Sequence, residues 1–174
     1  VYGSRYALFL GIVIVAIQML VGVTLGMIAG YYKDTYVEGA IMRLVDISLS
    51  IPDIVLALAI AGVLGGGLLP LIIAVSIVGW RGFARLVRGD VRTIMEDDYV
   101  RAAQMSGVSD VSIMLRRVLP NAIDSVIVYA TLNIPTVILY AAGLSFLGLG
   151  VNPPTPEWGA LVAAGRGDLQ GAWW

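Results

Sequence analysis

Long runs without charge dominate this chain and restrict it to a helical, membrane-spanning fold. Residues 6–32, 54–80 and 125–156 contain no Asp, Glu, Lys or Arg. A charge at the centre of a bilayer costs roughly 2.5–3.5 kcal/mol on insertion scales, so such runs are typical of transmembrane helices. At about 1.5 Å per residue, each run is long enough to cross a hydrocarbon core of about 30 Å. A composition of 59% hydrophobic and 13% charged residues agrees with this interpretation.

We therefore predict one all-α transmembrane domain over residues 1–174, with four spans. The expected spans are about 6–32, 41–64, 69–86 and 123–147. The Gly65–Gly67 run and Pro70 separate the second span from the third. Pro135 predicts a kink or break in the fourth span, although neighbouring helices can also satisfy the carbonyl that a proline leaves free.

One polar segment, residues 97–120, predicts a compact elbow of two short helices joined at Gly107. Apolar residues recur at helical spacing on both sides of that glycine: Val100 and Ala103, then Val111, Met114, Leu115 and Val118. Asp97 or Asp98 is a candidate N-cap of the first helix and Ser109 of the second, and glycine permits the positive φ that a sharp reversal needs. We expect Pro120, which lacks a backbone N–H, to end the elbow before the next apolar run.

The basic residues predict which side of the membrane the elbow faces. Those around the elbow are Arg81, Arg85, Arg88, Arg92, Arg101, Arg116 and Arg117. The positive-inside rule places the elbow in the cytoplasm, with the Gly65–Gly67 turn and both ends of the chain outside. The first four of these arginines share one helical face. They are candidates for contacts with lipid headgroups or a partner protein, or for simple anchoring of the topology.

Three residues within the spans are candidates for the transport pathway or for an interhelical contact: Pro52 with Asp53, and Asn133. Acidic residues within a membrane are functional candidates by default. Asp46 lies three residues after Arg43, which favours a local ion pair. In the first span, Gly22, Gly26 and Gly30 place small residues on one face and predict close packing, either within this subunit or against a partner.

The residue types that are absent exclude several kinds of chemistry. The chain has no cysteine and no histidine, so thiol nucleophiles, disulfides and Ser–His triads are excluded within it. There is no GxxxxGK[ST] phosphate loop, and we expect the chain neither to bind ATP nor to act as an enzyme. Asp34 and Glu38 favour a solvated polar loop over a metal pair. We expect no cofactor and no bound metal, and no nucleic-acid partner because no basic soluble domain is present.

Five segments, in order, resemble the dipeptide/oligopeptide/nickel permease family of ABC importers, and specifically the second permease of a pair. They are RLVDISLSIPDIVLALAI, WRGFARLVRGDV, DYVRAAQMSG, RRVLPNAI and LSFLGLGVNPPTPEWGALV. Within the third, AAQMSG resembles the cytoplasmic EAA loop. Family members usually carry Glu before the paired alanines, whereas this chain has Arg101, which puts in doubt any ATPase contact that the Glu makes.

The resemblance implies a type I-like helical bundle in a prokaryotic inner membrane, from which one further helix at each end is missing. It implies three kinds of partner: a second permease, two ATPase subunits that bind ATP, and an external solute-binding protein. The implied ATPase-docking residues are Tyr99, Arg101, Ala102, Ala103, Gly107, Leu119 and Pro120. Peptides are the expected cargo. Alternatives are nickel or another small solute, or a channel or secondary transporter without an ATPase.

The segment 151–171 is rich in proline and follows the last span. We expect it to form an external loop with a short helix around 160–165. It is a candidate for receiving the binding protein, and a packed loop without a partner is the alternative.

Overall fold

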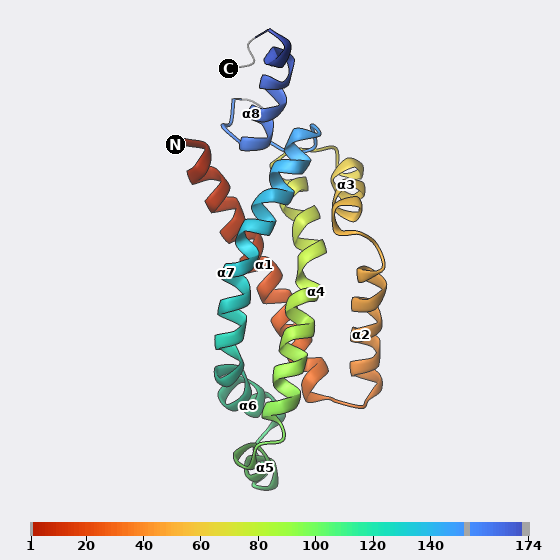
Figure 1. The fold of residues 1–174 in the computed structure, drawn as a ribbon. Helices are drawn as coiled ribbons and strands as arrows, with labels where there is room; N and C mark the ends of the chain where they lie inside the picture. Colours follow the sequence, from red (N-terminus) through yellow and green to blue (C-terminus); the bar gives the residue numbers. More distant parts are fainter. Residues whose placement is uncertain (1, 152–153, 172–174) are drawn as a thin grey trace. The chain divides into compact units, whose positions relative to one another are not determined.

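The computed structural model describes residues 2–151 and 154–171, and every regular element in this part is a helix (Figure 1). In chain order these are α1 (Tyr2–Tyr31), α2 (Tyr36–Leu49), α3 (Asp53–Val63), α4 (Leu68–Ile94), α5 (Asp98–Met105), α6 (Asp110–Ile113), the π-helical turn η1 (Met114–Val118), α7 (Leu119–Phe146), α8 (Trp158–Gly165) and the 3-10 turn η2 (Arg166–Gln170). The expected all-α class is confirmed.

Within the described residues, three helices are long and apolar enough to cross a membrane: α1, α4 and the continuous helix Asp110–Phe146. A fourth span is present if α2 and α3 are counted together. The segment expected as one span, 41–64, is thus divided after Leu49. Pro52 lacks a backbone N–H and has an extended ψ of 134°, so the helical hydrogen-bond ladder cannot continue through it.

The third and fourth spans also differ from the expected ones. The third span was expected to end near residue 86, but α4 continues to Ile94 through its arginine-rich end. Of the alternatives considered for Pro135, a break is contradicted, because α7 continues through this residue. A proline inside a membrane helix is tolerated when other groups satisfy the carbonyl it leaves free.

The chain forms two compact units, through both of which α1, α4 and α7 run. The first unit consists of Val1–Ala16, Ile51–Gly79 and Leu132–Trp174. In it, the turn between α3 and α4 is made by three glycines with positive φ, and Gly67 N donates to Gly150 O at 3.0 Å. The helix expected around 160–165 is α8. The carboxylate of Glu157, which is 2% exposed, caps α8 by accepting from Ala160 N.

The second unit consists of Ile17–Ser50 and Trp80–Thr131. Here α1 packs closely on α4 through its glycine face, since a Cβ on Gly26 would lie 2.6 Å from Ala84 O. Of the two partners considered for this glycine face, the structure therefore shows one, a helix of the same chain. Val45 of α2 and Trp80 and Ala84 of α4 form a core cluster beside it. Two rings in edge-to-face contact, Phe83 and Tyr129, join α4 to α7.

Candidate functional site

The elbow in the second unit is built from α5 and α6 around Gly107. Gly107 has a φ of 75°, so the predicted positive angle is confirmed. Gly107 N donates to Gln104 O and Val108 N donates to Ala103 O, the paired bonds of a Schellman motif. Asp97 and Ser109 occupy the N-cap positions, but neither side chain makes a capping bond. The elbow is therefore turned by its backbone at one glycine.

The second helix of the elbow is the beginning of the last span. Pro120 was expected to end the elbow, but α6, η1 and α7 form one helix from Asp110 to Phe146. The preceding turn is π-helical, and Leu119 N donates to Met114 O, five residues back. A proline ring normally clashes with the carbonyl four residues earlier, and the wider turn provides room for it. A displacement of the elbow would act directly on α7.

The proposed docking residues divide between an exposed and a buried face. The exposed members are Tyr99, Arg101, Ala102, Gly107 and Pro120, while Leu119 is half-buried. Ala103 is only 9% exposed and packs inward with the fully buried Val100. Exposed groups are available to a partner, whereas the buried alanine holds α5 in place.

A side-chain bond fixes α5 to the start of α7. The amide Nδ2 of Asn121 donates to Tyr99 Oη at 3.0 Å and to Arg117 O at 2.6 Å. Tyr99 is 40% exposed, so its hydroxyl is held while part of its ring remains open. This bond stiffens the elbow, and nothing in the sequence between residues 99 and 121 indicated it.

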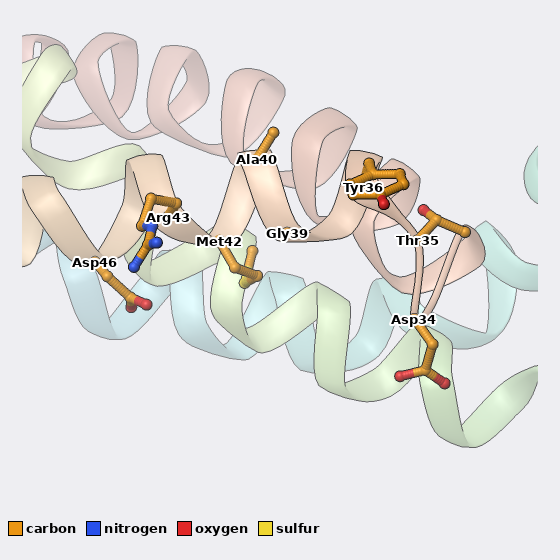
Figure 2. A pocket seen from close by; sticks show the side chains of 8 residues that line it. All are labelled: Asp34, Thr35, Tyr36, Gly39, Ala40, Met42, Arg43 and Asp46. Atoms are coloured by element: carbon orange, nitrogen blue, oxygen red, sulfur yellow. The ribbon is translucent and has the colours of Figure 1, made fainter.

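The arginines of α4 bind α2, a contact that none of the interpretations from the sequence included. Arg81 donates to Ser48 O, and Arg85 pairs with Asp46 at 2.6 Å. Asp46 was expected to pair with Arg43, but its partner is Arg85 of α4. Arg43 and Asp46 line the same hollow beside α2 (Figure 2). These pairs join residues on neighbouring helices that are far apart in the sequence, so no local sequence pattern predicts them.

Glu38 lies at the centre of a second ion-pair cluster. Its carboxylate is 6% exposed and accepts from Arg88 Nε at 2.6 Å and Arg92 Nη1 at 3.2 Å. It also accepts from the backbone N of Asp34 at 2.6 Å, where φ is 60°. The solvated loop predicted here is wrong for Glu38. Among the described residues, no group of three or more His, Cys, Asp or Glu could hold a metal ion.

An open hollow of about 1160 Å³ lies beside α2 and the turn that precedes it (Figure 2). All its lining residues come from positions 34–46. A hollow lined by one helix and its preceding turn is an open surface and does not enclose a small molecule. The elbow is therefore the stronger candidate site in this unit.

The candidate polar residues of the spans lie in the first unit. Asp53 is half-buried at the first turn of α3, where Tyr140 Oη donates to its Oδ2 at 3.5 Å. Pro52 is exposed just before it, and Asn133 is half-buried on α7. Asp53 thus makes a contact between helices α3 and α7, one of the two roles considered for it.

The sequence prediction missed a contact between the end of α1 and the elbow. Tyr31 Oη donates to Asp110 Oδ1 at 2.7 Å, and Tyr32 Oη donates to Asp110 Oδ2 at 3.3 Å. Their partner lies 78 and 79 positions along the chain, so no local pattern connects them.

Comparison with known proteins shows which family this chain is similar to. Residues 22–172 match the family described as "Binding-protein-dependent transport system inner membrane component". The chain is 42% identical over its full length to the di/tripeptide transport system permease protein DppC of Pseudomonas aeruginosa, covering 57% of that protein. It is 40% identical over 96% of its length to the glutathione transport system permease protein GsiD of Pectobacterium atrosepticum, covering 55% of it. The chain thus spans a little more than half the length of these relatives.

Proposed function

We propose that this chain, which belongs to the family of binding-protein-dependent transport system inner membrane components, has a role in transport. It is a membrane-spanning part of an ABC importer permease that moves peptides across a prokaryotic inner membrane. The peptide assignment is supported by relatives whose names specify di/tripeptides and glutathione. The same family resemblance also implies nickel or another small solute as alternative cargo.

The observation that carries this proposal is the elbow itself. It combines an exposed face, a backbone-fixed turn at Gly107 and a continuous helix from Asp110 to Phe146. A rigid contact surface that continues without a break into a membrane helix converts a push from a docked partner into movement of that helix. A channel or secondary transporter without an ATPase would leave this surface without a role.

The proposed assembly contains a second permease, two cytoplasmic ATPase subunits and an external solute-binding protein. One ATPase docks on the exposed elbow face of Tyr99, Arg101, Ala102 and Gly107, with Leu119 and Pro120 at its edge. ATP is bound by the ATPase subunits and drives their closure, and this chain performs no bond chemistry. The elbow then switches the permease pair between inward- and outward-facing states. Segment 151–171 receives the binding protein on the outside.

The proposal is tested at Gly107. We expect Gly107→Leu to lower ATP-driven peptide import severalfold in the reconstituted transporter, because a branched side chain strains a φ of 75°. A Cβ at this position would meet nothing within 4 Å, so within this chain only the backbone angle is perturbed. Gly107→Asn is the matched control, because Asn tolerates the left-handed region and retains more activity.

Co-purification of the ATPase subunits and the ATP hydrolysis rate are measured beside import. Full import by Gly107→Leu would contradict a coupling role for the elbow turn. Import that continues without any ATPase subunit would favour the channel or secondary transporter.

Arg101 provides a separate test of the docking face. Its side chain is exposed at the position where the resemblance implies an acidic residue. We propose that the partner surface here is complementary to a positive charge. Arg101→Glu is then expected to lower import with the native ATPases, because like charges in a partly desolvated contact are costly. Unchanged import would show that Arg101 lies outside the interface, whereas Arg117→Glu controls for the loss of a positive charge elsewhere on the elbow.

A further inference from the structure

Three side chains join the end of α1 to the first turn of the elbow's second helix. Each carboxylate oxygen of Asp110 accepts one hydrogen bond: Oδ1 from the hydroxyl of Tyr31 at 2.7 Å, and Oδ2 from the hydroxyl of Tyr32 at 3.3 Å. Hydrogen bonds to a charged acceptor are stronger than neutral ones. The two rings also contact each other edge to face at 5.1 Å, which orients both hydroxyls. We call this group, Tyr31, Tyr32 and Asp110, the latch.

Asp110 occupies a position where a carboxylate has a second advantage. It is in the first turn of the helix that continues to Phe146. Negative charge is favoured at a helix N-terminus, where the backbone N–H groups and the helix dipole are positive. The latch therefore attaches to the helix at its N-terminal end, next to the turn of the elbow.

The turn after α1 also contacts the other flank of the elbow. Lys33 Nζ pairs with Glu96 at 3.4 Å, two residues before α5 begins at Asp98. Asp34 pairs with Arg92 at 3.6 Å near the end of α4. These pairs are largely exposed and weak individually, but together with the latch they hold the turn against both flanks of the elbow.

We propose that the latch transmits movement of the elbow to α1, in addition to the movement that passes directly to α7. When the ATPase displaces the elbow, α7 moves because it is continuous with α6, and α1 moves because Asp110 holds Tyr31 and Tyr32. These three are positioning residues, and none of them needs to touch ATP or cargo. The inference rests on the proposed function, since it assigns a route for the force that the ATPases supply.

The test uses the complete transporter, with both permeases, the ATPases and the binding protein in proteoliposomes, and a radiolabelled dipeptide as the probe. The double variant Tyr31→Phe/Tyr32→Phe removes both hydroxyls and keeps both rings. We expect peptide imported per ATP hydrolysed to fall about tenfold or more, because the loss of even one hydrogen bond to a charged group corresponds to about a tenfold change in an equilibrium constant. ATPase co-purification and basal ATP hydrolysis should stay at wild-type levels. Tyr36→Phe is the matched control, because that side chain is 99% exposed.

A double-mutant cycle separates a direct latch from a general structural effect. Asp110→Asn alone should lower the import-to-hydrolysis ratio similarly, and adding it to the double phenylalanine variant should cause no further loss. Multiplied losses, or a wild-type ratio in the double phenylalanine variant, would overturn the latch. Wild-type import in the presence and absence of ATP tests the proposed function separately, so the two ideas fail on different measurements.

Discussion

We expect Gly26→Leu to prevent the accumulation of correctly folded permease. A Cβ at this position would lie 2.6 Å from Ala84 O and 2.9 Å from Val87 Cβ, and both atoms belong to the fixed body of α4. Overpacking a tight interface costs roughly 1–3 kcal/mol, and a clash with backbone lies at the upper end of that range or above it. Fluorescence-detected size-exclusion chromatography measures the yield of monodisperse protein directly.

Gly89→Leu is the matched control for this substitution. Gly89 also lies within a long helix, α4, but a Cβ there would meet nothing within 4 Å. Both substitutions gain the same helix propensity over glycine, so the difference between them isolates the close approach of α1 to α4. Equal yields of the two variants would show that α1 and α4 do not pack through Gly26.

We expect Glu38→Ala to destabilise the permease by roughly 2–3 kcal/mol. The substitution leaves Arg88, Arg92 and the N–H of Asp34 without their shared acceptor. Removing one partner of a fully buried ion pair costs about 3–5 kcal/mol. The loss here is smaller because the Arg88 and Arg92 side chains keep 30% and 36% of their surface exposed. The free energy of unfolding in detergent micelles is the quantity to measure.

Asp46→Ala is the comparison for Glu38→Ala. Asp46 also pairs with one arginine of α4, at 2.6 Å, but the two side chains are 59% and 56% exposed. Exposed pairs contribute about 0–1 kcal/mol, so this variant should unfold almost like the wild type. A loss of stability at Asp46 equal to that at Glu38 would contradict the role assigned to burial. Glu38→Gln should fall between the two, since its amide oxygen can still accept one hydrogen bond.

The elbow shows how much of the candidate site was predictable from local sequence. Gly107 has the positive φ expected of it because the need for glycine arises within one turn of chain. Pro120 was misjudged because the π-helical turn that admits it depends on how residues 114–118 pack. The bond from Asn121 to Tyr99 also required knowledge of where two helices meet.

The break near Pro52 shows the same contrast between what local sequence predicts and what depends on tertiary structure, here within a membrane span. Apolar composition predicted one span over 41–64, because hydropathy averages over windows longer than a break. A proline carries a local signal for a helix boundary, and the structure ends α2 three residues before it. At Pro135 the same residue type leaves α7 intact, so tertiary surroundings decide which proline interrupts a helix.

Local sequence was enough to predict the membrane class, the all-α fold and the glycine turn of the elbow. Each of these follows from properties summed along neighbouring residues: charge-free length, helical periodicity and the backbone freedom of one glycine. Only the tertiary structure decided the partners of the charged side chains, including Glu38 with Arg88 and Asp110 with two tyrosines. Such pairs depend on which helix faces meet, and residues 50 or 79 positions apart share no local pattern that specifies their distance in space.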